Sequence, residues 1–355
     1  MITGLTIQNF RGFRDMTLEG LARVNLLVGD NGSGKTALLE AVFLAMSNSP
    51  MAALQLRGAR GLPAEISSDT FGEFFTEGSK EATISTTGPE PFERALHVRY
   101  DPSRTIVIPG RREETSSHGT TPQPSGLPQS NVLVPPLVFR WQDSDGKTDE
   151  AAVQIGPAGV EIGSAGLEFV GTQLHSAAQG GQGAAASIFS MLDRADNSAP
   201  FIEKMKQQFP QIEVIAVQVE GVRPLLYARV AGQKHQRPLE LHSGGMTRLA
   251  LMLLSIAVPT TRIVLIDEIE NGLHHARFRL LWQQVRDFAV RFDTQVFVTT
   301  HSLECLDAAA DAMSEHPEDF ALMRTVRTED KGCLVGLLPG ARAGQLVRSR
   351  LEVRG

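Results

Sequence analysis

Short apolar runs recur along the chain, and each is followed by small or polar residues. The run at 24–28 precedes a glycine-rich stretch, the run at 263–266 ends in two acidic residues, and the run at 295–299 precedes a histidine. Runs without polar alternation are typical of strands buried on both faces of a parallel sheet. Apolar helical runs occupy 36–46 and 249–256. The pattern therefore predicts an α/β fold with a parallel-sheet core flanked by helices.

The remaining segments carry weaker patterns. Apolar residues alternate approximately through residues 1–30, which predicts strands, whereas glycine and proline recur between 50 and 240. The segment 109–136 is rich in Pro, Ser, Thr and Gln and is expected to be a long mobile loop. A flexible Gly/Ala/Gln-rich connection is expected at 179–186. Further expected elements are strands at 94–100, 105–108, 133–141, 152–155, 211–219 and 225–230, helices at 201–209 and 303–313, and a hairpin at 329–332.

The glycine-rich stretch at 29–36 reads GDNGSGKT between a predicted strand and a predicted helix. In this context glycines let backbone N–H groups converge on phosphate oxygens, and the helix N-terminus adds its positive end. Lys35 is expected to reach the β- and γ-phosphates, and the Thr36 hydroxyl to hold Mg²⁺. The stretch therefore predicts a nucleotide-binding P-loop, whose phosphate contacts are expected from Asn31, Gly32, Ser33, Gly34, Lys35 and Thr36.

Two carboxylates, Asp267 and Glu268, follow the second apolar run. Ligands of open α/β sheets bind at the carboxyl ends of the strands, so these acids are placed to act on a bound nucleotide. Asp267 is expected to hold Mg²⁺, and Glu268 to take the proton from an attacking water. The alternative is a strand capped by two solvated acids, and the neighbouring P-loop favours the functional interpretation.

Three further patterns complete a series. Ser243, Gly244 and Gly245 precede an apolar helical run, which is again a geometry that binds anions. The loop 270–274 reads ENGLH, and His301 follows the last apolar run. Alone, a glycine pair is often a simple turn and a lone histidine is often structural, but here each has its place in an ordered series of motifs.

The order of these motifs resembles the ATP-binding-cassette (ABC) class of P-loop ATPases, and more closely its RecF, SMC and OLD-type branch of AAA-family ATP-binding proteins. The opening segment 2–14 resembles that branch's first strand and its Asn-Phe-Arg-x-Phe motif. The resemblance covers about 1–48 and 238–355. It implies a two-lobe head, with a mixed-sheet lobe and a parallel-sheet core, in a single unit spanning 1–355.

The resemblance also implies a working scheme. Two copies would close as a homodimer over two ATP molecules, with Ser243, Gly244 and Gly245 contacting the nucleotide of the other copy. His301 would sense the γ-phosphate, and the loop 270–274 would run along the dimer interface. Arg11 and Phe13 would lie near the nucleotide base or phosphates.

Two departures from the family pattern are visible. The signature reads His-Ser-Gly-Gly-Met, and the glutamine loop has only Gln142 and Gln173 as candidates. The segment 50–240 is expected to be an insertion that extends the first lobe, before the signature and catalytic lobe at 238–355. Only 54 residues follow His301, with no Asp-x-Asp cluster. The chain is therefore expected to be an ATPase part without a Toprim nuclease.

Composition is that expected of a cytoplasmic enzyme. The formal charge is −6, the two cysteines form no close pair, and no signal peptide or apolar run of membrane-spanning length is present. His274 and His275 are expected to have a dimer-interface or capping role rather than to bind a metal, because no third ligand has helical spacing. A solvated helix face is favoured over nucleic-acid contact for Arg342, Arg348, Arg350 and Arg354.

The sequence thus predicts a Mg²⁺-dependent ATPase that dimerises on ATP and drives a DNA-processing, repair or anti-phage defence partner, such as a separate nuclease or effector, or DNA itself. Two alternatives stay open: a transporter-type ATPase subunit coupled to a permease, and an ATP-gated regulatory module with negligible turnover. The long insertion and the opening motif disfavour the first. Glu268 and His301 disfavour the second.

Overall fold

The computed structural model describes residues 1–62, 70–101, 106–108, 132–134, 137–154, 160–162, 170–175 and 182–348. The loop expected at 109–136 lies outside these residues, except for 132–134. These three residues form a short strand paired with 106–108.

The centre of the fold is a group of five parallel strands at one end of a thirteen-stranded sheet. Their order is β11, β15, β16, β3 and β17, so the predicted strand at 24–28 has parallel neighbours on both sides. Their bounds are Gly171–His175, Thr261–Ile266, Gln295–Thr299, Val24–Gly29 and Phe320–Thr328. The carboxyl ends of β3, β15 and β16 carry the motifs at 29–36, 267–268 and 301.

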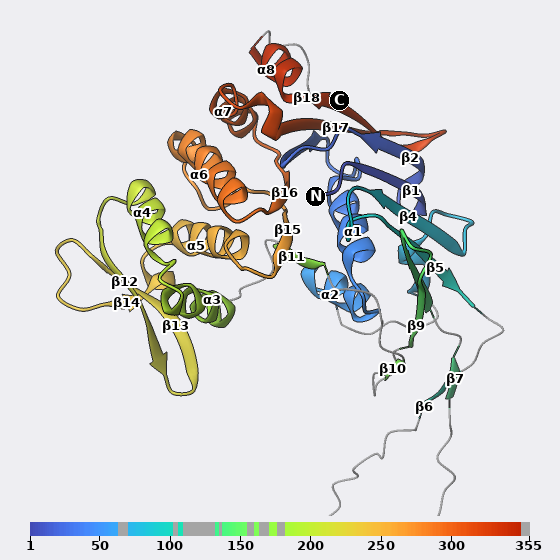
Figure 1. Ribbon diagram of the computed structural model, residues 1–355, viewed down its shortest axis with the longest axis horizontal. Coiled ribbons are helices and arrows are strands. Elements are labelled where there is room, and N and C mark those ends of the chain that lie inside the picture. Colours follow the sequence, from blue (N-terminus) through green and yellow to red (C-terminus); the bar gives the residue numbers. More distant parts are fainter. Residues whose placement is uncertain are drawn as a thin grey trace, which may run out of the picture.

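The rest of the sheet is antiparallel and curves away from the parallel strands (Figure 1). β18 connects the two parts, since it pairs with β17 on one side and with β2 on the other. Beyond β18 the order is β2 (Phe13–Glu19), β1 (Gly4–Phe10), β4 (Glu81–Thr87), β5 (Arg94–Tyr100), β8 (Leu137–Asp143), β9 (Thr148–Gln154) and β10 (Val160–Ile162), with β18 itself at Gly332–Pro339.

Two hydrophobic cores lie on opposite faces of the parallel strands. Leu265 and Phe297 point into a core shared with α1 (Lys35–Met46), α2 (Met51–Ala59) and the antiparallel strands. Val264 and Val298, one position earlier or later, point into a second core with the remaining helices. This alternation explains the unbroken apolar runs in the sequence, because both faces of each strand are buried. α1 is likewise buried on nearly all sides.

The second core is covered by helices on the far side of the parallel strands from α1 (Figure 1). These are α3 (Gln182–Arg194), α4 (Ala199–Gln208), α5 (Gly244–Ile256), α6 (Phe278–Arg291), α7 (Leu303–Ala312) and α8 (Gly340–Arg348). A small sheet, β12 (Ile212–Glu220), β13 (Arg223–Val230) and β14 (Arg237–Pro238), packs on α3 and leads into α5.

The segment 50–240 divides between the two sides of the molecule. Its first part adds β4, β5, β8, β9 and β10 to the antiparallel strands, and its second part supplies β11, α3, α4 and the small sheet. The expected flexible connection at 179–186 is wrong for 182–186, which form the start of α3. Ala185 and Ala186 are buried there in the second core, so packing and the high helix propensity of alanine outweigh the glycines.

The predicted α/β fold, with a mixed lobe and a parallel core, is confirmed. None of the helices described in these ranges is long and apolar enough to cross a membrane.

Candidate active site

The glycine-rich loop 29–36 leads from the buried end of β3 into the first turn of α1. Gly34, which caps α1, has a left-handed backbone with φ of 105°. A Cβ atom there would lie 3.0 Å from Cζ of the buried Phe13 ring. Glycine is required for both reasons, the backbone conformation and the close approach of the ring.

The Lys35 side chain folds back onto this loop. Its Nζ donates hydrogen bonds to the carbonyl oxygens of Gly29 at 2.8 Å and Asp30 at 2.9 Å, and the residue is only 5% exposed. On the inner side of the loop, Ser33 Oγ and Thr325 Oγ1 are 2.5 Å apart. The loop is thus tied to β17. The Lys35 ammonium group is held at the loop, where it can bind phosphate oxygens.

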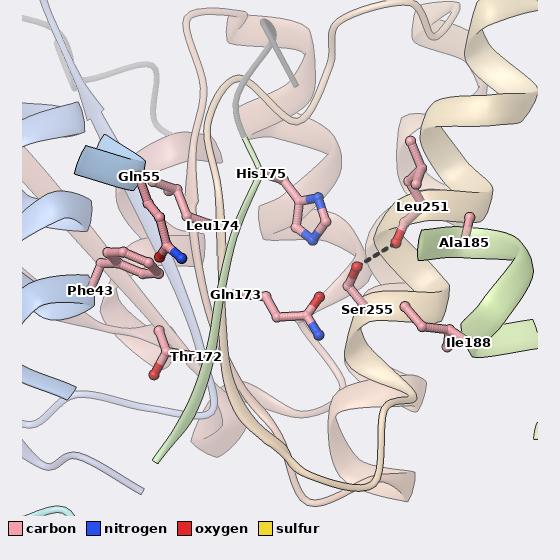
Figure 2. A pocket seen from close by; sticks show the side chains of 10 residues that line it. All are labelled: Phe43, Gln55, Thr172, Gln173, Leu174, His175, Ala185, Ile188, Leu251 and Ser255. Atoms are coloured by element: carbon pink, nitrogen blue, oxygen red, sulfur yellow. Dashed lines mark hydrogen bonds between the residues drawn. The ribbon is translucent and has the colours of Figure 1, made fainter. Parts of the chain in front are cut away.

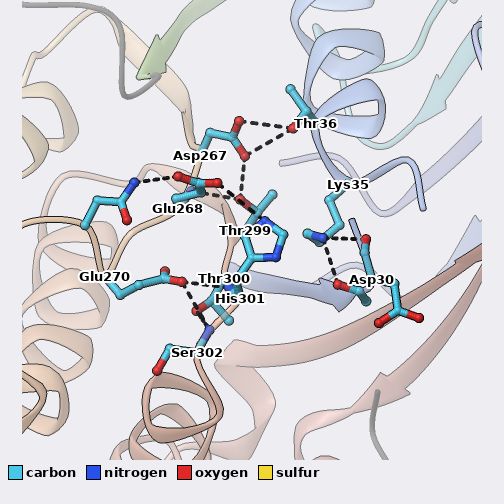
Figure 3. Close-up of polar contacts among 12 residues, drawn as sticks. Asp30, Lys35, Thr36, Asp267, Glu268, Glu270, Thr299, Thr300, His301 and Ser302 are labelled. Carbon is cyan, nitrogen blue, oxygen red and sulfur yellow. Dashed lines mark hydrogen bonds and ion pairs between the residues drawn. The ribbon is translucent and has the colours of Figure 1, made fainter. Parts of the chain in front are cut away.

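Thr36 and Asp267 face each other from α1 and the end of β15 (Figure 3). Thr36 Oγ1 lies 3.1 Å from Asp267 Oδ2, and Thr299 Oγ1 donates to Asp267 Oδ1 at 2.5 Å. Neighbouring ligands of an octahedral Mg²⁺ at about 2.1 Å lie about 3 Å apart. The hydroxyl and carboxylate oxygens therefore have the chemistry and the separation of two ligands of one Mg²⁺ ion.

Glu268 has a left-handed backbone with φ of 53°, which is uncommon for a residue with a side chain. Its Oε2 accepts a hydrogen bond from Asn271 Nδ2, and its Oε1 lies 3.4 Å from His301 Nε2. The Glu268 and His301 side chains are 38% and 37% exposed, so both are open to solvent and to a ligand. Strained backbone of this kind is concentrated in functional sites.

Arg248, on α5, contacts the backbone of the carboxylate segment 267–268. Its Nη2 donates to the carbonyl oxygens of Asp267 at 2.8 Å and Glu268 at 2.6 Å. Burial lowers the pKa of Arg248, and the nearby carboxylates, Glu268 first, raise it in opposition. No sequence motif marks Arg248 as a functional residue. Its position five residues after Ser243 is the one feature that relates it to the predicted site.

A cavity of about 480 Å³ lies at this site. It is lined by Gly29, Asp30, Asn31, Glu268, Glu270, Asn271 and His301. The structure thus brings the start of the P-loop, Glu268 and His301 to one cavity, although more than two hundred residues separate the P-loop from the other two in the sequence.

The Ser243-Gly244-Gly245 segment begins α5 but does not line this cavity within the described part of the chain. Ser243 is the N-cap, and its Oγ accepts a hydrogen bond from Gly245 N at 3.2 Å. A Cβ atom on Gly245 would lie 2.4 Å from the carbonyl oxygen of Gly272, so the segment packs directly on the loop 270–274.

Arg11 and Phe13 both lie beside the P-loop and its helix. Phe13 is fully buried, and its ring contacts the P-loop at Gly34 from the inner side. Arg11 Nε lies 2.7 Å from Oε2 of the buried Glu40 of α1, and burial lowers the pKa of Arg11. Arg60, the C-cap of α2, binds the same carboxylate. Both residues therefore support the P-loop helix, and their place near the base or phosphates of a nucleotide stays a prediction.

The other candidates are dispersed. Gln142 is exposed on β8, whereas Gln173 lies on β11 and donates to Thr261 Oγ1 at 3.0 Å. His274 and His275 are exposed, with ring centroids 4.2 Å apart, and no cluster of three metal-ligating side chains occurs among the residues that the structure describes. Arg342 is exposed on α8, the side chain of Arg348 is not described, and Arg350 and Arg354 lie outside the described ranges.

A second cavity, of about 330 Å³, lies beside β11 (Figure 2). His175 points into it, and the carbonyl oxygen of His175 accepts a hydrogen bond from Asp267 N at 2.8 Å. Burial lowers the pKa of His175 to about 4, and the positive charge of Arg248 contributes. His175 is therefore neutral at physiological pH and lies directly beside the carboxylate segment.

Comparisons with known proteins agree with this geometry. Residues 4–96 match a family described as an AAA domain, and residues 158–307 match one described as an AAA domain, putative AbiEii toxin, of a type IV toxin–antitoxin system. An ATP/GTP phosphatase of Helicobacter pylori is 23% identical over 90% of both chains. The DNA replication and repair protein RecF of Idiomarina loihiensis is 46% identical over 12% of each chain.

The fold is also found among solved structures. An Smc head bound to the C-terminal winged-helix domain of ScpA aligns with a TM-score of 0.54 and 14% identity, over 97% of this chain and 99% of that one. An Smc head with an extended coiled coil, bound to the C-terminal domain of ScpA from Pyrococcus furiosus, aligns with a TM-score of 0.51 and 12% identity, over 98% and 99%. At these identities the likeness concerns the fold.

The fold and the matched families support a P-loop ATPase of the ABC class. Within that class, the chain is similar to RecF in part of its sequence and to Smc heads in its fold.

Proposed function

We propose that the chain is a Mg²⁺-dependent ATPase head that dimerises on ATP and drives a DNA-processing, repair or defence partner. The observation that carries the proposal is a cavity lined by the start of the P-loop, Glu268 and His301. Lys35 binds the carbonyl oxygens of two lining residues, and Thr36 faces Asp267, the residue before Glu268. The similarity to RecF and the toxin–antitoxin description of the matched family support the choice of partner.

In the proposed mechanism, the loop N–H groups and Lys35 bind the phosphates. Mg²⁺ bound at Thr36 and Asp267 would neutralise charge on the β- and γ-phosphates during transfer. Glu268 accepts a proton from the attacking water, and His301 orients the γ-phosphate and that water. Positioning and electrostatic stabilisation supply most of the acceleration.

Dimerisation supplies the missing side of the site. Ser243, Gly244 and Gly245 lie outside the cavity of their own chain within the described ranges, which supports a role on a second copy. The start of α5 presents backbone N–H groups and a serine hydroxyl, a combination that binds a phosphate. A γ-phosphate held between the two copies would close the dimer. Hydrolysis of ATP would then let the two copies separate.

The test is the size of the Glu268→Gln protein by light scattering, with and without Mg²⁺ and ATP. We expect the variant to bind ATP, lose turnover and accumulate as a dimer. Ser243→Arg in the same background should bind ATP but stay monomeric, whereas Ser314→Arg, at an exposed serine on the far end of α7, should still dimerise. ATP-bound Glu268→Gln that stays monomeric would refute the dimer scheme.

A parallel series with short double-stranded DNA separates two kinds of partner. An ATP-dependent dimer that retains DNA indicates a head that clamps nucleic acid, and an ATP-dependent dimer that ignores DNA indicates a protein partner. Because the Helicobacter relative is named for both nucleotides, turnover should be measured with ATP and with GTP.

A further inference from the structure

Glu270 lies two residues after Glu268 and holds the peptide that carries His301. Its Oε1 accepts hydrogen bonds from the backbone N–H groups of His301 at 2.7 Å and Ser302 at 3.1 Å (Figure 3). Ser302 is also the N-cap of α7. One carboxylate oxygen therefore fixes the turn between β16 and α7, from which the His301 side chain extends toward Glu268.

The next residue, Asn271, binds the Glu268 side chain, which lies opposite His301. Its Nδ2 donates to Glu268 Oε2, while Glu268 Oε1 lies 3.4 Å from His301 Nε2. The loop after β15 thus binds both groups that the proposed mechanism needs, Glu268 through its side chain and His301 through its backbone. The same loop packs on Gly245 at the start of α5, so both sets of hydrogen bonds depend on the position of the loop 270–274.

A purely structural explanation leaves part of Glu270 unaccounted for. Its Oε2 is buried and has no hydrogen-bond partner among the described residues, although Glu270 lines the nucleotide cavity. A carboxylate there also repels the phosphates of a nucleotide. Hydrogen bonds from N–H groups to a carboxylate are about twice as strong as those to a neutral acceptor. The site therefore accepts a charge unfavourable for binding in return for a firmly held turn.

We propose that Glu270 is a positioning residue that places His301 against Glu268 and the γ-phosphate. The inference rests on the proposed function, since it needs His301 to act in hydrolysis. It adds a specific claim: Glu270 acts through His301 and has little effect on turnover by any other route. Its loss should lower kcat while the KM for ATP stays constant or falls, because the repulsion disappears with the carboxylate.

The experiment is a double-mutant cycle on phosphate release from ATP, with Glu270→Ala, His301→Ala and the double variant. A misplacement of about 1 Å can cost about 100-fold in rate, so we expect each single variant to lose about 10- to 100-fold in kcat. The double variant should be no slower than His301→Ala alone. Glu304→Ala is the matched control, because Glu304 contacts the Ser302 hydroxyl from the exposed side and leaves the backbone N–H groups untouched.

The outcomes separate the two claims. If His301→Ala loses turnover but the losses in the double variant multiply, Glu270 does not act through His301 and the inference is overturned. If His301→Ala hydrolyses ATP at the wild-type rate, the role of His301 in the proposed function fails first. If Glu270→Ala does not fold, Glu270→Gln keeps an acceptor for both N–H groups. It should then retain more activity than His301→Ala with an unchanged or lower KM, and activity equal to that of His301→Ala would contradict the inference.

Discussion

The link between Arg248 and the carboxylate segment leads to a quantitative prediction for Arg248→Met. Methionine keeps the apolar stem of the side chain and removes the guanidinium that donates to the carbonyl oxygens of Asp267 and Glu268. Hydrogen bonds that involve a charged group contribute about 1.5–3 kcal/mol each. Removing the desolvation cost of the partly buried guanidinium offsets part of this loss, so we expect a net destabilisation of about 2 kcal/mol.

The catalytic effect should be larger than the effect on stability suggests. Glu268 is held at a φ of 53°, a conformation that costs about 1–2 kcal/mol, and its carbonyl is one of the two groups that Arg248 binds. Without that hydrogen bond the segment can relax, and a shift of about 1 Å in the carboxylate would lower kcat by about 100-fold. Nucleotide affinity should fall less than kcat, because the P-loop, from which most phosphate contacts are expected, does not depend on the two hydrogen bonds of Arg248.

The assay combines phosphate release, ATP binding and thermal unfolding. For a chain of this size, about 2 kcal/mol corresponds to a fall of about 3 °C in the unfolding midpoint. Arg262→Met is the control, since Arg262 lies on β15, the strand that leads to Asp267, but pairs only with the exposed Asp293 at 3.4 Å within the described chain. Arg248→Met with a kcat within about twofold of wild type would show that this link does not position Glu268.

Three further predictions follow from single residues. Lys35→Ala should abolish tight ATP binding, measured by titration calorimetry, because the ammonium group that would bind the phosphates is lost; a retained affinity would contradict the P-loop assignment. Gly34→Ala should destabilise the chain and weaken ATP binding more than Gly32→Ala, since both have positive φ but only at Gly34 would the new Cβ meet neighbouring atoms within 4 Å. For His175, burial lowers the pKa to about 4 against about 6.5 when unfolded, so the unfolded chain takes up the proton first as the pH falls. Urea unfolding should therefore show stability falling from pH 6.5 to 4 by about 3 kcal/mol, and His175→Gln should flatten that part of the profile.

The sequence predicted the parts of the site that are contiguous motifs. Asp267 and Glu268 follow a buried apolar run directly, and Lys35 and Thr36 end the glycine-rich loop that follows another. The end of a strand therefore marks these residues before any tertiary structure is known. His301 is marked in the same way by the run at 295–299. The parallel core could be predicted for the same reason, because strands buried on both faces leave unbroken apolar runs.

Residues that act across the fold gave no such signal. Thr299 binds Asp267, Arg248 binds the backbone after β15, and Glu270 binds the backbone before α7. Each is an ordinary polar residue in its own segment, and its role exists only once distant elements meet. The opening motif locates the Phe13 ring near the P-loop, but only the fold shows that the ring contacts the loop from its inner side.

The place of β17 and β18 in the sheet has a consequence for the order of folding. Among the described strands, this carboxyl-terminal hairpin alone joins the antiparallel half to the parallel half, and Thr325 on β17 also holds the P-loop through Ser33. During synthesis the P-loop leaves the ribosome about three hundred residues before the strand that supports it. Contacts of such long sequence separation form slowly. The P-loop therefore gains this support only after β17 has been made, and until then the two sheet edges that pair with the hairpin stay open.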